Sequence, residues 1–517
     1  MLENSVNEPD RAPGETKFEM SSIPHLRKAY LKRIRKKCRR LYKKPCYEQR
    51  VWLKDFDNLD VRDKISFIHE LLFRCDSESL KVINTTLSNL RKVDFISELP
   101  KDLALFLISK LEVKSLIYSS QVNHLWAALT NCEWVWKSAY EKLISENGGG
   151  LPIQTKLTNN SWKTLCVQEY AIITNWYSKR FLTRELLGHR EEIITYIKLD
   201  GNRIISGSVD FTIKIWSTET GELIHNLEGH TGGVWSCYVE GNLVISGGTD
   251  QTIRIWDAQE GRCLHVLYGH TSTVRCLDAS GDMLVSGGRD HTVRVWNILS
   301  GECLLLLRGH TQSVRCVQFD GKIVVSGSYD HTLRVWDPVS GRCLHVLTGH
   351  TNRVYSLQMK GSTIVSGSQD TTIRVWCAET GKCLSVLSGH SSLVGLLQLR
   401  GNLLLSGNAD KSLRLWDVKT GQTLHVLNGH ENAITCLWFD NVKIVSGAMD
   451  GSLRLWSVKT GECYGKLLQL EGGGIIWRVA CSHSQIVVGA SANNEASLRI
   501  LDFAISPKKL AELKRGK

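Results

Sequence analysis

The chain's 517 residues are too many for one ordinary domain and predict two or three folded units, and a hydrophobic content of 42% excludes a mainly disordered chain. The net charge of +12 lies at the two ends, because residues 1–46 hold 13 Lys/Arg against 5 Asp/Glu and residues 508–517 hold 5 against 1. The remainder has 46 of each sign, so its charge gives no indication of nucleic-acid binding.

Residues 1–46 are predicted to form a basic, disordered arm. The first ten residues lack the pattern of a signal peptide, and no run of about 18 uncharged apolar residues occurs in the chain. We therefore expect no membrane association and a location in the nucleus and cytoplasm. The segment KRIRKKCRRLYKK at 32–44 fits a nuclear-import signal or a solvated basic arm equally well, and nucleic-acid binding by this arm is a further alternative.

Residues 47–92 are predicted to be helical. Their apolar side chains recur at helical spacing, at Val61, Ile65, Ile68, Leu72, Leu80, Ile83, Leu87 and Leu90. An apolar face on so short a segment needs a partner, and a second copy of the chain would supply one. The segment therefore predicts a homodimer.

Residues 93–137 are predicted to form a unit of short helices. Pro100 follows Leu99 as a helix-start signal, and the apolar residues after it are Leu103, Leu107, Leu111, Leu116, Val122 and Trp126. Such a unit has apolar surface left over, which indicates docking onto a partner, although an ordinary helical bundle is the alternative. Residues 138–180 follow as a helical linker, with a loop at 147–160.

A period of forty residues dominates the rest of the chain. Gly-His pairs begin at 188, 229, 269, 309, 349, 389 and 429. Each is followed in register by a serine, then by an aspartate four residues later and a tryptophan six residues after that, as in Ser246, Asp250 and Trp256. Short alternating strands and Gly-rich turns lie between these markers. Four short strands per forty residues are typical of a blade of a WD-repeat β-propeller.

An eighth unit at 467–503 keeps three strand-like runs but lacks the Gly-His pair and the turn aspartate. We predict that it is a degenerate eighth blade and that the propeller spans 181–507, with a basic tail at 508–517. The predicted fold class is α+β multidomain, a helical region followed by an eight-bladed WD-repeat β-propeller.

The repeated His, Asp and Ser could suggest a hydrolase triad, but seven equivalent copies favour a structural hydrogen-bond network. The spacing of many of the 16 cysteines also follows the repeat, as Cys303, Cys343, Cys383 and Cys463 show. We interpret them as small buried residues of a reducing compartment. No zinc-type cysteine or histidine spacing occurs, so no metal or cofactor is expected.

Two columns of the repeat vary between blades, and variable exposed positions of a repeat scaffold carry specificity. Five residues after the histidine stand Ile194, Trp235, Arg275, Arg315, Tyr355, Gly395 and Thr435; before the turn aspartate stand Val209, Thr249, Arg289, Tyr329, Gln369, Ala409 and Met449. Three arginines thus fall in two adjacent blades. Clustered guanidinium groups repel one another and suit a phosphate dianion, although pairing with local acids is the alternative. Other arginines recur two residues before each blade tryptophan and belong to the scaffold.

LPKDLALFLISKL at 99–111 closely matches an F-box motif, and GHTSTVRC at 269–276, SGGRD at 286–290, VRCVQFDG at 314–321 and GHTNRVYSLQ at 349–358 lie in the propeller. This combination resembles the F-box/WD-repeat substrate receptors of cullin-RING (SCF) ubiquitin ligases, of the Archipelago or cell-division-control type. The resemblance covers about residues 47–507.

The resemblance implies that the F-box residues Leu99, Pro100, Leu103, Leu107, Leu111 and Trp126 bind the Skp adaptor and, through it, a cullin. It implies a propeller site for a doubly phosphorylated degron of the phospho-Thr-Pro type. The first phosphate would meet Arg275, Arg289, Arg315 and Tyr329. The second phosphate or acidic group, four residues later, would meet Ser272, Thr273 and Arg289. The proline would meet Trp235 and Thr249, and the peptide backbone or its upstream residue would meet Tyr355 and Arg478.

The function implied is that of a non-catalytic receptor that brings cyclin E-, Notch- or Myc-like phosphoproteins to ubiquitination and degradation, with a role in the cell cycle. One departure is Gln251, which replaces a basic residue of the relatives near the second phosphate. The alternative is a WD-repeat scaffold for signalling complexes without coupling to a ubiquitin ligase.

Overall fold

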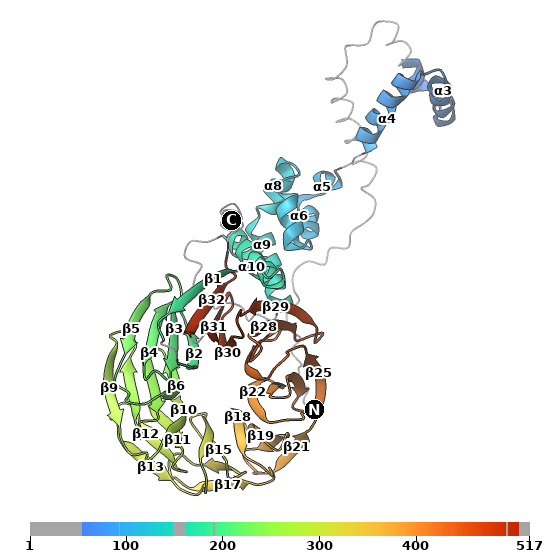
Figure 1. The fold of residues 1–517 in the computed structure, drawn as a ribbon. Coiled ribbons are helices and arrows are strands. Elements are labelled where there is room, and N and C mark those ends of the chain that lie inside the picture. The colour runs from blue at the N-terminus through green and yellow to red at the C-terminus, as the bar shows by residue number, and fades with distance from the viewer. Residues whose placement is uncertain (1–53, 92–93, 148–160, 190–191, 493–494, 506–517) are drawn as a thin grey trace, which may run out of the picture. The chain divides into compact units, whose positions relative to one another are not determined.

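The structure is a computed structural model that describes residues 54–91, 94–147, 161–189, 192–492 and 495–505 (Figure 1). The chain divides into two compact units, Met1–Ala139 and Tyr140–Lys517. The predictions for the arm at 1–46, for most of the loop at 147–160 and for the tail at 508–517 lie outside the described residues. None of the described helices is long and apolar enough to span a membrane.

The described part of the first unit is helical, as predicted. Its helices are α3 (Val61–Phe73), α4 (Ser77–Arg91), α5 (Phe95–Glu98), α6 (Lys101–Ser109), α7 (Val113–Ser119), α8 (His124–Thr130) and the start of α9 (Glu133–Glu146). Pro100 directly precedes α6, where its fixed φ suits a helix start. The predicted boundary at 137 falls inside α9, so the segment named as a linker begins within a continuous helix.

The helical unit at 93–137 has a small core around one polar anchor. Ile108 and Leu116 are buried in it. Asp94 caps α5 and also accepts hydrogen bonds from the Trp126 indole N–H at 2.9 Å and from the Asn123 amide at 2.8 Å. Asp94 therefore connects the start of α5 to α8, and the indole N–H of Trp126 is hydrogen-bonded inside the unit.

The second unit contains α10 (Trp162–Tyr177) and eight four-stranded antiparallel sheets, the blades of a propeller. In blades 1 to 4 the strands are β2 (Ile194–Asp200), β3 (Arg203–Ser208), β4 (Ile213–Ser217), β5 (Leu223–Leu227); β6 (Val234–Glu240), β7 (Leu243–Gly248), β8 (Ile253–Asp257), β9 (Arg262–Leu267); β10 (Val274–Ser280), β11 (Met283–Gly288), β12 (Val293–Asn297), β13 (Cys303–Leu307); and β14 (Val314–Phe319), β15 (Val324–Ser328), β16 (Leu333–Trp336), β17 (Cys343–Leu347). The first strand of each blade faces the centre of the ring and the fourth lies at its rim (Figure 1).

Blades 5 to 7 repeat the same order. Their strands are β18 (Val354–Lys360), β19 (Thr363–Ser368), β20 (Ile373–Cys377), β21 (Cys383–Leu387); β22 (Val394–Arg400), β23 (Leu403–Asn408), β24 (Ser412–Asp417), β25 (Gln422–Asn428); and β26 (Ile434–Phe439), β27 (Lys443–Ala448), β28 (Ser452–Ser457), β29 (Cys463–Gln469). Apolar side chains pack between consecutive blades, as where Ile255 of blade 2 shares a core with Val274 and Trp296 of blade 3.

Blade 8 closes the ring with strands from both ends of the propeller sequence. It consists of β30 (Ile475–Cys481), β31 (Gln485–Ala492), β32 (Glu495–Asp502) and, as its outer strand, β1 (Leu182–Leu187). β1 pairs with β32 in an antiparallel register from Leu182 opposite Asp502 to Leu187 opposite Ser497. The eighth unit had only three strand-like runs in the sequence because its fourth strand comes from the N-terminal end.

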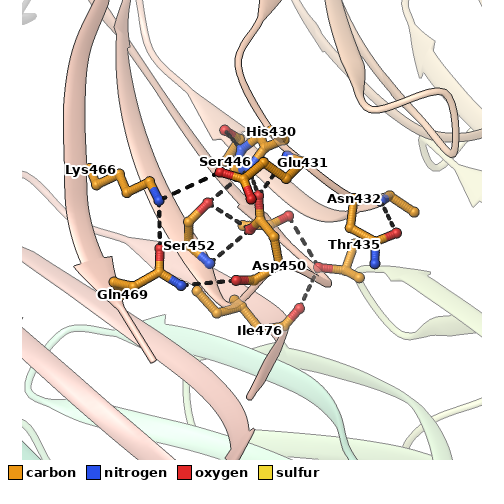
Figure 2. A network of polar contacts seen from close by, with 12 residues as sticks. His430, Glu431, Asn432, Thr435, Ser446, Asp450, Ser452, Lys466, Gln469 and Ile476 are labelled. Carbon is orange, nitrogen blue, oxygen red and sulfur yellow. Dashed lines mark hydrogen bonds and ion pairs between the residues drawn. The ribbon is translucent and has the colours of Figure 1, made fainter. Parts of the chain in front are cut away.

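The repeated polar residues form the predicted network inside each of blades 1 to 7, shown for blade 7 in Figure 2. The Trp456 indole N–H donates to the Ser446 hydroxyl at 2.8 Å, and Ser446 lies 2.7 Å from Nε2 of His430. Nδ1 of His430 lies 3.2 Å from Asp450, which also accepts from the hydroxyl of Ser452 at 2.6 Å. The network satisfies polar groups that would otherwise be buried without partners.

The geometry of this network resembles a catalytic triad, yet its serine has another task. Each serine is fully buried and accepts the indole hydrogen bond of the blade tryptophan. Burial would raise the pKa of Asp250, but the hydrogen bond and charge of His230 and two main-chain N–H groups outweigh it and lower that pKa to about 2. The constellation therefore holds the blades together, as predicted.

The prediction that the repeated cysteines are buried is correct for one column and wrong for another. Cys276 and Cys436, on inner strands, are buried, and Cys316 of the same column is partly buried. The column that begins or nearly begins the outer strands is exposed, and it comprises Cys263, Cys303, Cys343, Cys383 and Cys463. The outer strand is an edge strand with no further blade layer beyond it, so its alternate side chains face solvent.

Candidate functional site

A β-bulge sets the direction of the first variable column. The register between the two innermost strands shifts between Val274 and Cys276 in blade 3 and between Val314 and Cys316 in blade 4. The residue inside each bulge is an arginine, Arg275 or Arg315. A bulged residue leaves the regular alternation of the strand, and its side chain is aimed away from the sheet faces.

A repeated main-chain hydrogen bond sets the position of the second column. The N–H of Arg289 donates to the carbonyl of Thr273 at 2.9 Å, and the N–H of Tyr329 donates to the carbonyl of Ser313 at 3.0 Å. Each bond ties the turn before the blade aspartate to the loop that leads into the inner strand. The two variable columns therefore lie beside each other at one end of the blades.

The two columns meet in a pocket of about 230 Å³. It is lined by Trp235, Thr249, Thr273, Arg275, Arg289, Ser313, Val314, Arg315 and Tyr329. Seven of the ten propeller residues predicted from the sequence are thus brought together by three consecutive blades. The additional lining residues are Ser313 and Val314; Ser313 stands, like Thr273, three residues after the histidine of its blade, a signal that the repeat itself contains.

The pocket is strongly positive. Its lining contains three arginines and no aspartate or glutamate. Burial and the positive charges of Arg315 and Arg289 lower the pKa of Arg275 to about 10. The Arg275 guanidinium carbon lies 4.0 Å from the ring centre of Trp235, which fixes its position from one side. Pairing of this cluster with local acids, the alternative left open by the sequence, does not occur in the lining.

The aromatic wall of the pocket consists of Tyr329 in the lining and Tyr355 packed behind it. The rings of Tyr329 and Tyr355 lie 5.1 Å apart, centre to centre. Burial raises the pKa of Tyr329 more than the nearby arginines lower it. The phenol therefore keeps its proton at neutral pH, and a hydrogen bond with the side chain of Tyr355 contributes to the raised pKa.

Three predicted residues do not line the pocket. Ser272 precedes Thr273 in the same loop and is half-buried, and Tyr355 contacts the pocket through Tyr329. Arg478 bridges blades instead, because its Nε donates to the carbonyl of Thr195 in blade 1 at 2.7 Å and its Nη1 lies 3.5 Å from the carbonyl of Thr435 in blade 7. Arg478 thus joins the last blade to both of its neighbours.

Gln251, the departure noted in the sequence, is exposed beside the pocket wall. It follows the turn aspartate of blade 2 in the left-handed region, with a φ of 67°. The equivalent position of the next blade is His291, also with a φ of 67°. The Gln251 side chain is neutral, so it cannot supply the positive charge of the missing basic residue.

The helical unit at 93–137, which the sequence predicts to be an F-box, presents a second candidate surface. Among the predicted adaptor residues, Pro100 and Leu107 are exposed, while Leu99, Leu103, Leu111 and Trp126 are partly buried. The structure adds Phe106, Tyr118, Val122 and Leu125, which are exposed apolar side chains of α6 to α8 or lie next to them. Exposed apolar surface of this extent on a small unit indicates a protein-binding surface.

Within the described ranges, no group of three or more His, Cys, Asp or Glu side chains could hold a metal ion. The charge of the pocket comes from arginine alone, and its preferred ligand is an anion.

The comparisons with known proteins agree with this architecture. The family model "WD domain, G-beta repeat" matches residues 180–217, 221–257, 261–297, 301–337, 341–377, 381–417 and 421–457, which together make up half of the chain. The crystal structure of the computationally designed Ika8 protein is similar with a TM-score of 0.58 and 35% identity, over 62% of this chain and 98% of the designed one.

Two curated relatives carry informative names. "F-box/WD repeat-containing protein 7" of Drosophila melanogaster is 41% identical over 37% of this chain and 15% of its own length. "Probable E3 ubiquitin ligase complex SCF subunit sconB" of Trichophyton verrucosum is 27% identical over 40% of this chain and 39% of its own. The chain therefore matches well under two thirds of the length of these relatives. The fold and the seven matched repeats show that the chain belongs to the WD-repeat family, and its relatives include F-box/WD-repeat proteins.

Proposed function

We propose that this protein is the substrate-recognition subunit of an SCF-type ubiquitin ligase. In this role the propeller pocket binds phosphorylated Thr-Pro segments, and the F-box unit binds the Skp adaptor that connects to the cullin. The observation that carries the proposal is the pocket in which Arg275, Arg289 and Arg315 converge without an acidic partner in the lining. The name of the sconB relative, a probable SCF subunit, supports the same role.

The chemistry of the pocket fits a phosphate dianion. Arginine forms bidentate, charge-assisted hydrogen bonds to phosphate oxygens, and the Tyr329 phenol can donate a further one. Repulsion among the three guanidinium groups contributes to the lowered pKa of Arg275. A bound dianion would relieve this repulsion. An unphosphorylated threonine offers neither effect, so a kinase would control binding.

The rest of the pocket fits the residues on either side of the phosphate. The indole of Trp235 and the side chain of Thr249, which both line the pocket, would contact the proline ring. Ser272, Thr273 and Arg289 would hold a second phosphate or acidic side chain four residues further on. The neutral Gln251 makes this second subsite weaker than a basic residue would.

The proposed role needs no bond chemistry in this chain. A receptor that holds the substrate beside a ubiquitin-conjugating enzyme raises the effective concentration of the substrate lysines. The transfer itself would be carried out by the other subunits, and the result would be proteasomal degradation of regulatory proteins. The identity of those proteins and the location in the nucleus and cytoplasm stay predictions.

A bridging experiment tests the whole function. Beads that carry a peptide with phospho-Thr-Pro and a second phosphate four residues on are incubated with the full-length chain and purified Skp adaptor. We expect the beads to retain both proteins, and the unphosphorylated peptide to retain neither. Leu107→Asp, on the exposed surface of α6, should leave the chain on the beads and release the adaptor.

Leu264→Asp, an exposed position on outer strand β9, is the matched control and should change neither result. Retention of the wild-type chain without adaptor would favour the scaffold alternative. Failure of the phosphorylated beads to retain the wild-type chain would contradict the proposed pocket function.

We also propose a homodimer through α3 and α4. These helices leave Ile65, Ile68, Leu71 and Phe73 exposed, and Phe73 is 86% exposed. Ile68→Asp is expected to convert a dimer of the full-length chain into a monomer, because a buried charge without a partner opposes association. Sedimentation equilibrium measures the change, Leu304→Asp on outer strand β13 is the control, and a monomeric wild-type chain would contradict the proposal.

A further inference from the structure

We infer that the propeller has an additional anion subsite at Arg353, which recognises an acidic or phosphorylated side chain on the side of the phosphothreonine away from the proline. This inference rests on the proposed function and specifies its substrates further. It would make the site selective for peptides with negative charge on both sides of the phosphothreonine.

The first observation is positional. Arg353 stands three residues after the histidine of blade 5, as Thr273 does in blade 3 and Ser313 does in blade 4. Thr273 and Ser313 both line the pocket. The main-chain carbonyl of Arg353 accepts from the N–H of Gln369 at 2.9 Å, the same bond that fixes Thr273 and Ser313. The backbone of Arg353 is therefore held as the backbones of two lining residues are.

The second observation is the contact of Arg353 with the pocket wall. Its guanidinium carbon lies 5.1 Å from the ring centre of Tyr329, which lines the pocket. The ring of Tyr329 packs in turn against Tyr355. Arg353 is thus at the far side of the aromatic wall, next to the phosphate subsite but separated from it by a ring.

The third observation concerns charge. Arg353 is exposed, and no carboxylate of the described residues forms an ion pair with it. Some exposed arginines elsewhere on the propeller do have such partners, as Arg262 does with Glu260 at 2.8 Å. A free guanidinium stacked on one ring keeps its outward N–H groups available for a carboxylate or phosphate.

The order of the blades gives the subsite its direction. Blade 2 supplies Trp235 and Thr249 for the proline, blades 3 and 4 supply the arginines, and blade 5 supplies Arg353. A peptide whose proline lies over blade 2 extends over blade 5 with its residues before the phosphothreonine. Those residues would therefore face Arg353.

The test compares peptides that carry glutamate or glutamine at each of the four positions before phospho-Thr-Pro, bound to the full-length chain. At one or more positions the glutamate peptide is expected to bind about threefold to fivefold more tightly, the range of an exposed charge pair. This preference should fall toward unity in about 1 M salt. Arg353→Gln should abolish the preference, while Arg262→Gln, at the opposite end of the blade strands, should keep it.

Three outcomes overturn the inference. One is that the wild-type chain binds the glutamate and glutamine peptides equally, and another is that Arg353→Gln keeps the preference. The third is that Arg353→Gln weakens both peptides by the same factor, because Arg353 would then only support the Tyr329 ring. Loss of the requirement for phosphothreonine itself would instead contradict the proposed function, so the two failures are distinguishable.

Discussion

Alanine in place of Arg275 or Arg315 is expected to weaken binding of a phospho-Thr-Pro peptide by about 30-fold or more, or about 2 kcal/mol or more. Each substitution removes charge-assisted hydrogen bonds to a phosphate that has left bulk water. Arg275 is the more constrained of the two, because its guanidinium is held against Trp235. Fluorescence anisotropy of a labelled peptide on the full-length variants measures the loss.

The controls separate charge from geometry. Arg275→Lys keeps the charge but not the planar fork, and we expect it to recover only part of the affinity. Arg262→Ala removes an exposed arginine on outer strand β9 and should leave affinity unchanged. Wild-type affinity in both Arg275→Ala and Arg315→Ala would contradict the assignment of the pocket.

The fold was readable from the sequence because each blade repeats one set of constraints. The period of forty, the Gly-His pair and the turn aspartate recur wherever the same network is needed, so seven copies reinforce one another. The two variable columns could be predicted because their residues differ between blades. Residues such as Arg275 and Tyr329 differ from their counterparts in other blades, and the shared scaffold does not require them.

Features that depend on contacts distant in sequence could not be read in this way. The outer strand of blade 8 is β1, some 300 residues before β32. The residues of the two strands do not indicate that they pair with each other. The bulges that aim Arg275 and Arg315 arise from the register between two strands rather than from residue type. The exposure of Cys303 follows from its place on an edge strand, which the spacing of cysteines does not encode.

Arg478 shows the same limit within the candidate site. Its resemblance to a peptide-contacting residue follows from local sequence, but the structure has it bonded to Thr195 and Thr435 of the two neighbouring blades. Those partners lie far from it in the chain. The guanidinium N–H groups of Arg478 that bond to these carbonyls are not available to a ligand.

Alanine in place of Asp330 is expected to destabilise the propeller by about 3 kcal/mol or more. Asp330 accepts from the main-chain N–H groups of Thr311 and Thr332, each at 3.0 Å, from the Thr332 hydroxyl at 2.7 Å and from Nδ1 of His310 at 2.8 Å. Its loss leaves these donors without an acceptor inside blade 4. Denaturant unfolding of the full-length chain, followed by tryptophan fluorescence, measures the change.

The same substitution should lose its effect in acid. Burial alone would raise the pKa of Asp330, but His310, Thr332 and the N–H of Thr311 hold it well below its ordinary value of 3.8. A carboxyl whose pKa is lowered by folding stabilises the folded state above the unfolded pKa, and this contribution is lost as the pH falls toward the folded pKa. The difference between wild type and Asp330→Ala should therefore be constant above about pH 5 and shrink below about pH 4. Asp337→Ala, in the same blade but outside the network, should change stability far less; an equal loss, or a difference independent of pH, would show that the ionised network does not hold the blade together.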